Sequence, residues 1–96
     1  MKMVMISYNE AIDSEVTEAL EACGLKNYTK IAATYGRGTT SGTHLGNDIW
    51  PGRNNILLIA SDEQKINLLF SSIKELRKKL GREGVKAFVW DLEEVT

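Results

Sequence analysis

The sequence is poor in the residue types that build disulfide frameworks, metal clusters and membrane spans. It has one cysteine, Cys23, one histidine, His44, and one proline, Pro51, in 96 residues. A single cysteine cannot form an intrachain disulfide or a cysteine-based zinc site, and it suits a reducing compartment. The longest apolar run, Ile56 to Ala60, is far below the roughly 18 residues that cross a bilayer, and no charged-then-apolar leader precedes it. We therefore expect a cytoplasmic protein without membrane insertion.

An excess of charge of one sign is also missing, because 12 Lys and Arg balance 13 Asp and Glu. The formal net charge of -1 provides no global basic field for nucleic acid, although a local basic cluster can still hold a phosphate. With 43% hydrophobic content, the 96 residues fit one small domain, residues 1–96, and are too few for two. A domain of this size buries only about 60 to 65% of its unfolded surface, which favours self-association.

Hydrophobic periodicity predicts four strands and two helices. The strands are expected over residues 2–8, 28–35, 55–60 and 85–95. One helix is expected from Glu10, with its apolar stripe ending before Gly24 as a C′ residue. The other is expected to begin at Asp62, because Ser61 to Gln64 match the S-x-x-Q capping box, and to end at Gly81.

The resulting order, β-α-β-β-α-β, is that of an α+β ferredoxin-like domain with an antiparallel sheet. In the usual arrangement the first and third strands are central, and both helices cover the same face of the sheet. Those two strands, Met3 to Ile6 and Ile56 to Ile59, are apolar on both sides. A strand needs two apolar sides only if its second face is also buried. We therefore predict that the open face of the sheet packs against other subunits.

The glycine-rich segment 36–54 is the leading candidate for a functional site. Its 19 residues hold five of the eight glycines, and loops longer than roughly 12 to 15 residues tend to be functional or disordered. At its base, Gly36-Arg37-Gly38 combines accessible backbone N–H groups with a guanidinium, which suits an anion. A simple turn is the alternative interpretation, because no phosphate-binding or dinucleotide-binding glycine motif occurs in the chain.

The same segment holds most of the unusual side chains. His44, with Asn47 and Asp48 nearby, suits a metal site if symmetry gathers three copies, and a solvent-exposed loop histidine is the alternative. Trp50 marks the return of the loop, with its indole packed on the body of the protein or presented to a partner.

Catalysis has little support in the sequence. Cys23 falls on the apolar helix stripe, where an inert core thiol is expected, and the carboxylates are scattered over solvated faces. An acylphosphatase-like enzyme needs an anion-cradling loop after the first strand, but Tyr8 to Ile12 contain neither arginine nor glycine. Recognition of single-stranded RNA needs aromatic rings on the central strands, and those strands offer none there. We predict that the protein is not an enzyme.

Several of these features together resemble the PII (GlnB-like) signalling proteins. They are the strand order, Tyr35-Gly36-Arg37 at the end of the second strand, Gly42-Thr43-His44 in the long loop, and Lys86 to Asp91 in the last strand. The resemblance implies a homotrimer with its sheets facing inward and a regulatory, non-enzymatic role. It also implies that an adenine nucleotide, ATP, ADP or AMP, binds between subunits. The long loop would then engage a transporter or enzyme target, in nitrogen regulation.

Individual residues follow from the same resemblance. Gly36, Arg37 and Gly38 correspond to the loop base that meets the nucleotide. Lys86 resembles the basic residue that faces phosphate, and Gly84 resembles a glycine of the short loop before the last strand. The residues expected to meet the partner are Thr43, His44, Asn47, Asp48, Trp50 and Arg53.

The chain also departs from the family pattern. The residues after Asp91 lack the Arg-x-Arg segment that holds phosphates, and Glu93 and Glu94 disfavour a polyphosphate there. The long loop carries no tyrosine for uridylylation. We therefore expect a divergent PII-like member whose ligand differs from ATP. Two alternatives share the fold class: a CutA-like trimer that binds a divalent metal through His44, and an ACT-type small-molecule sensor.

Overall fold

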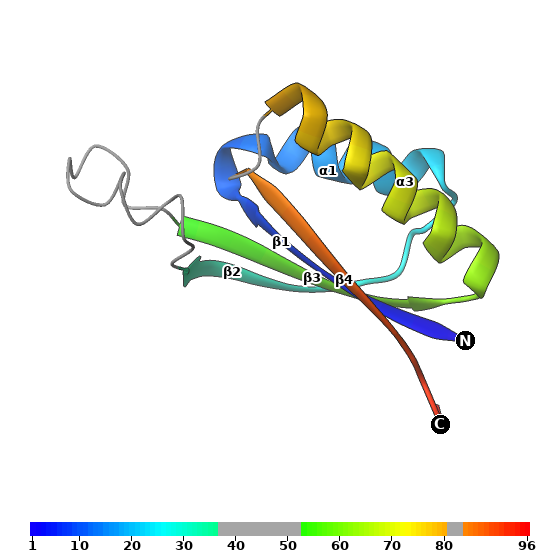
Figure 1. The fold of residues 1–96 in the computed structure, drawn as a ribbon. Helices are drawn as coiled ribbons and strands as arrows, with labels where there is room; N and C mark the ends of the chain where they lie inside the picture. The colour runs from blue at the N-terminus through cyan, green and yellow to red at the C-terminus, as the bar shows by residue number, and fades with distance from the viewer. Residues whose placement is uncertain (37–52, 81–83) are drawn as a thin grey trace.

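The computed structural model describes residues 1–36, 53–80 and 84–96. Its elements are β1 (Lys2–Asn9), the 3-10 turn η1 (Glu10–Ile12), α1 (Asp13–Ala22), β2 (Thr29–Tyr35), β3 (Arg53–Ser61), α3 (Glu63–Leu80) and β4 (Val85–Asp91). Within the described residues, four strands form one antiparallel sheet in the order β2-β3-β1-β4, and two α-helices cover one of its faces (Figure 1). The predicted ferredoxin-like arrangement, with the first and third strands central, is thereby confirmed.

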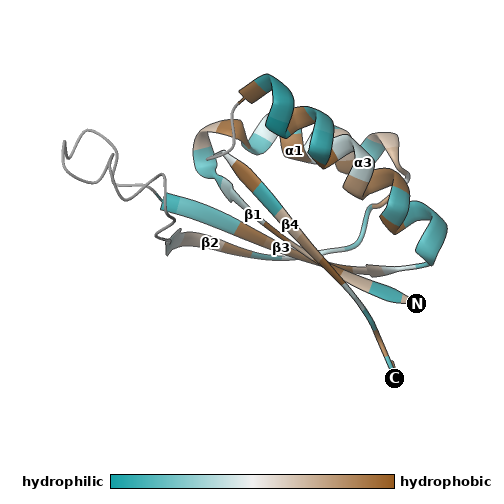
Figure 2. Ribbon diagram, viewed as in Figure 1, coloured by the Kyte–Doolittle hydropathy of each residue, from teal (hydrophilic) through white to brown (hydrophobic). Residues whose placement is uncertain are grey.

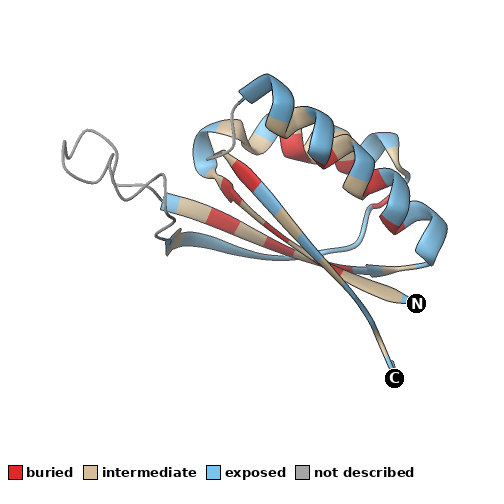
Figure 3. Cartoon of the chain, viewed as in Figure 1, coloured by how far each residue is buried: buried red, intermediate tan, exposed pale blue. Residues whose placement is uncertain are grey.

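The core lies between the helices and the side of the sheet that faces them (Figure 3). Along β1, Val4, Ile6 and Tyr8 are fully buried because alternate residues of a strand point to the same face. From β3, Leu57 pairs with Ile6 and Ile59 pairs with Val4, so the two central strands present one continuous apolar surface. The helices complete this core with Val16, Leu20, Ile66, Leu69 and Ile73.

The first helix begins later than predicted. A 3-10 turn occupies Glu10 to Ile12, and the α-helix starts only at Asp13. Asn9 causes this tighter turn, because its side-chain Oδ1 accepts a hydrogen bond from the backbone N–H of Ala11 at 2.9 Å. The end of α1 agrees with the prediction. Gly24 has a φ of +73°, a conformation that favours glycine, and the chain turns there out of the helix.

The second helix is capped by a different residue from the one predicted. Asp62, not Ser61, is the cap, since its Oδ1 accepts a hydrogen bond from the backbone N–H of Lys65 at 2.9 Å. Ser61 remains in β3, where it pairs with Lys2, and α3 begins at Glu63. A carboxylate also gains from the positive end of the helix dipole. The predicted capping box is therefore wrong by one residue.

The last strand is shorter than predicted. β4 ends at Asp91 and not at residue 95, because its partner β1 begins at Lys2, which pairs with Asp91. One further backbone hydrogen bond, from the N–H of Leu92 to the carbonyl of Met1 at 3.1 Å, closes the ladder. Beyond it β1 offers no further backbone partner, so the strand stops.

Candidate functional site

All four strands meet at one end of the sheet, next to the segments predicted to bind a ligand. β1 ends there at Asn9 and β2 at Tyr35, while β3 begins at Arg53 and β4 at Val85. The register pairs Tyr35 with Arg53 across the two outer strands of this half of the sheet. We call this end of the sheet, defined by these four residues, the loop end.

Three of the predicted ligand residues lie at the loop end. Gly36 directly follows β2 and is exposed, and a Cβ added to it would meet the side-chain Nδ2 of Asn54 at 2.7 Å. Gly84 directly precedes β4, and its carbonyl accepts a hydrogen bond from the backbone N–H of Asn9 at 2.9 Å. Lys86 is exposed on β4. The structure therefore places a glycine at each outer strand of the loop end and an exposed ammonium beside one of them.

Lys86 and Gly36 occupy opposite edges of the sheet. β2 and β4 are the outer strands, so three interstrand spacings, about 14 Å in total, separate them. Lys86 pairs with Ser7 on the side of the sheet away from the helices, and its Nζ lies 5.4 Å from the centroid of the Phe88 ring. A ligand that touches both Gly36 and Lys86 must extend across the loop end.

The remaining predicted site residues divide into two groups. Arg53 was expected in the loop, and this is wrong, because it is the first residue of β3 and pairs with Tyr35. β3 continues this far because β1 and β2 both offer it backbone partners, Asn9 opposite Asn54 and Tyr35 opposite Arg53. Seven predicted residues lie outside the described residues: Arg37, Gly38, Thr43, His44, Asn47, Asp48 and Trp50.

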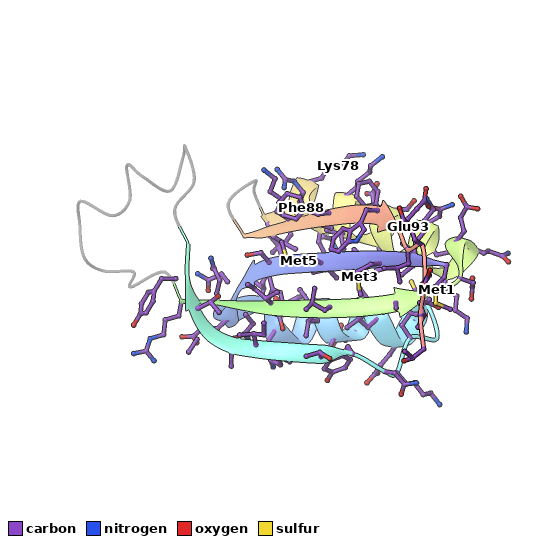
Figure 4. The ribbon with its side chains drawn as sticks, turned by 90° about the horizontal axis from the view of Figure 1, so that it is seen from below. Met1, Met3, Met5, Lys78, Phe88 and Glu93 are labelled. Atoms are coloured by element: carbon purple, nitrogen blue, oxygen red, sulfur yellow. The ribbon has the colours of Figure 1, made fainter. Side chains whose placement is uncertain are left out.

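The side of the sheet turned away from the helices is apolar. Residues paired across a ladder share a face, and Met5 pairs with both Leu58 and Phe88, while Met3 pairs with Trp90. Phe88 and Trp90 are 41% and 44% exposed. Figure 4 looks onto this side and labels Met3, Met5 and Phe88, and Figure 2 shows hydrophobic residues along the strands as well as the helices. We call this side the open face, with the apolar residues Met3, Met5, Ile31, Ile56, Leu58, Ala60, Phe88 and Trp90.

The two-sided apolar pattern of the central strands thus corresponds to two different surfaces. One is packed by α1 and α3, and the other is the open face. The aromatic rings of the open face come from β4, an outer strand, and not from the central strands. Packing of the open face against other subunits stays a prediction.

A hydrogen-bonded group of side chains lies on the helix side of the sheet, near the loop end. The hydroxyl of Tyr8 donates to Oδ1 of Asp13, and Lys30 Nζ donates to the same oxygen at 3.0 Å. Asn55, which is buried, donates through Nδ2 to Asp13 Oδ1 at 3.5 Å and accepts through Oδ1 from the backbone N–H of Ala33 at 3.3 Å. This Asp13 cluster connects β1, α1, β2 and β3.

The sequence interpretation missed the Asp13 cluster. Asp13 and Asn55 are 42 positions apart, and no local spacing pattern marks such a pair. The usable signal was Asn55 itself, an amide at the start of an apolar strand, because a buried polar side chain needs a hydrogen-bond partner. Its partners become apparent only when the sheet register is known.

The Asp13 cluster predicts a pH dependence of stability. Hydrogen bonds from Tyr8 and Lys30 hold the pKa of the Asp13 carboxyl below its ordinary value of 3.8. The ionised carboxylate therefore favours the folded state, and this contribution is complete above about pH 4 and is lost as the pH falls through the lowered pKa. We expect the free energy of unfolding, measured with urea between pH 6 and pH 2, to fall more steeply in the wild type than in Asp13→Asn.

The exposed helix carboxylate of Glu18 supplies the control, and Glu18→Gln should keep the steep wild-type dependence. An equally steep fall in Asp13→Asn would contradict the assignment.

In the described ranges 1–36, 53–80 and 84–96, no group of three or more His, Cys, Asp and Glu side chains could hold a metal ion. The predicted metal alternative rests on His44, which is outside these ranges. None of the helices described in these ranges is long and apolar enough to cross a membrane.

The whole chain, residues 1–96, matches the model of the family described as "Nitrogen regulatory protein P-II". Among solved structures it is similar to CPII, a nitrogen regulatory PII-like protein from Thiomonas intermedia K12, bound to ADP, AMP and bicarbonate. The TM-score is 0.73 at 20% identity, over 95% of this chain and 84% of that chain. The apo form of CPII gives a TM-score of 0.71 at 18% identity, over 95% and 87% of the two chains.

A protein from Thermus thermophilus described as PII-like signalling has a TM-score of 0.61 at 22% identity, over 95% of this chain and 85% of that chain. These identities show a shared fold. No curated protein sequence matches the chain.

Proposed function

We propose that this chain, which belongs to the nitrogen regulatory protein P-II family, is a regulatory protein that binds an adenine nucleotide at the loop end of its sheet. The family consists of signalling proteins and not of enzymes. In this proposal the nucleotide meets the loop base and the start of β4, through Gly36, Arg37, Gly38, Gly84 and Lys86.

The observation that carries the proposal is the placement of Gly36, Gly84 and Lys86 at one end of the sheet. Glycines allow the close approach of a ligand to backbone N–H groups, and an exposed lysine supplies the charge that a phosphate needs. Additional support comes from the shared fold, because the similar CPII structure holds ADP and AMP. The distance across the loop end suits an extended ligand better than a single small anion.

Among the adenine nucleotides, we propose ADP or AMP over ATP. Glu93 and Glu94 follow β4 and are exposed, and two carboxylates close to a polyphosphate raise its binding free energy. CPII with ADP and AMP is consistent with this choice.

We also propose that the protein assembles as a homotrimer through the open face. An exposed apolar surface with two aromatic rings on one side of a sheet is costly in water and is typical of an interface. The threefold state follows from the family resemblance. The loop residues Thr43, His44, Asn47, Asp48 and Trp50, with Arg53 of β3, would then contact a transporter or enzyme in nitrogen regulation in the cytoplasm.

Thermal unfolding with added nucleotides tests the proposed ligand. A ligand at about 100 times its Kd stabilises the folded state by roughly 2.7 kcal/mol, which raises the Tm of a domain of this size by several degrees. We expect ADP and AMP to raise the Tm, and GDP and inorganic phosphate at the same concentration to leave it unchanged. A shift with phosphate equal to that with ADP, or no shift with any adenine nucleotide, would overturn the proposal.

A further inference from the structure

Ala33 has an unusual backbone conformation inside β2. Its φ is +58°, and within the described residues no other residue except glycine has a positive φ. This left-handed region places the Cβ of an L-residue too close to its own backbone, so it costs free energy that a glycine would not lose. A strained residue of this kind persists only where its surroundings hold it.

The strain accompanies a β-bulge. β2 gains one residue over β3 between two successive pairs of the ladder, Ile31↔Ile56 and Thr34↔Asn54. An extra residue reverses the face on which every following side chain lies. Ile31 is on the open face, and Tyr35 would share that face in an unbroken strand. In the structure Tyr35 instead pairs with Arg53 on the opposite side of the sheet and is 78% exposed.

Two side-chain hydrogen bonds hold the bulge. The buried Asn55 accepts from the backbone N–H of Ala33 at 3.3 Å, and the hydroxyl of Thr34 donates to the backbone carbonyl of Asn54 at 2.8 Å. Asn55 is itself oriented by its donation to Asp13, which leaves its amide oxygen facing the bulge. The Asp13 cluster therefore reaches the backbone two residues before the loop end.

We propose that Ala33 and Asn55 are positioning residues that set the direction in which Tyr35 and Gly36 enter the ligand site. The proposal rests on the proposed nucleotide function for its effect on binding. The bulge directs Tyr35 away from the open face, and it fixes the backbone of Gly36 beside the start of β3. Strain at Ala33 is tolerated because this direction serves binding.

Two variants with opposite effects on stability test this proposal. Ala33→Gly relieves the left-handed strain, and we expect the Tm to rise by about 4 °C. Asn55→Leu has a similar volume but leaves the N–H of Ala33 without its acceptor, so we expect the Tm to fall. Both variants release the direction of the loop base. We therefore expect both to speed amide hydrogen exchange at Tyr35 and to weaken ADP binding, each about tenfold.

Ala32→Gly is the matched control, because it adds a glycine to β2 at a residue with an ordinary φ. It should lower the Tm and change the Kd for ADP by less than twofold. The proposal is overturned if ADP affinity follows the Tm, rising in Ala33→Gly and falling in Asn55→Leu, since that is the behaviour of residues that only stabilise the fold. It is also overturned if Ala33→Gly lowers the Tm.

Absence of ADP and AMP binding by the wild type would instead reject the proposed function. The exchange rate at Tyr35 and the Tm values, measured without nucleotide, would still decide whether Ala33 and Asn55 position the loop base.

Discussion

Replacing Leu58 by aspartate is expected to convert the assembled protein into monomers. Leu58 lies on β3, a central strand, and its side chain belongs to the open face beside Met5. In a trimer built on that face each subunit would bury the new carboxylate without a partner, at a cost of several kcal/mol per ion. In a free monomer the carboxylate would reach water on the open face. Light scattering should therefore give about 32 kDa for the wild type, three times the 10.7 kDa of one chain, and about 11 kDa for Leu58→Asp.

Leu68→Asp is the matched control for this experiment. Leu68 is 55% exposed on α3, on the other side of the molecule from the open face, and the same chemical change there should leave the mass unchanged. Circular dichroism of both variants checks that the fold survives. A wild-type mass near 11 kDa, or an unchanged mass in Leu58→Asp, would show that the open face is not the subunit interface.

Replacing Lys86 by alanine is expected to weaken ADP binding by roughly 10-fold to 100-fold. Hydrogen bonds to charged groups contribute about 1.5 to 3 kcal/mol, and each 1.4 kcal/mol is a factor of ten in Kd. The exposed ammonium over the Phe88 ring is positioned to meet a phosphate at the start of β4. Isothermal titration calorimetry measures the change directly. The effect should diminish from ADP to AMP, because AMP carries less phosphate charge.

Lys74→Ala controls for the loss of a lysine that lies over a phenylalanine. Lys74 Nζ is 5.1 Å from the centroid of the Phe70 ring on α3, a contact that closely matches that of Lys86 with Phe88. We expect Lys74→Ala to bind ADP with the wild-type Kd. Equal losses in the two variants would indicate a general effect of net charge, and no loss in Lys86→Ala would remove this residue from the site.

The local pattern of the sequence was sufficient to predict the class and order of the elements. Val4, Ile6 and Tyr8 alternate with Met3 and Met5, and an alternating apolar strand with apolar residues on both sides has few other uses than a central position. Gly24 predicted the end of α1, because its left-handed conformation is one that glycine adopts freely. Gly84 and Lys86 were named as ligand residues from the family resemblance, and their role remains a prediction.

Element boundaries were predicted less well, because neighbouring segments compete for the same backbone groups. Ser61 matched a capping box, but it forms the last pair of β3 with β1, and Asp62 takes the cap instead. Arg53 follows a glycine and a proline in a polar stretch, which indicates a loop. Its pairing with Tyr35 is decided by a strand 18 residues earlier, which no local window includes.

What the sequence alone determined was the alternation of two apolar periods along the chain, and with it the ferredoxin-like order and the doubly apolar central strands. These are properties of neighbouring residues, and they arise from the geometry of single strands and helices. The tertiary structure decided which polar groups meet: Asp13 with Tyr8, Lys30 and Asn55, and Asn55 with the strained Ala33. Hydrogen bonds act over about 3 Å in space and carry no record of sequence distance, so only the sheet register can bring these groups together.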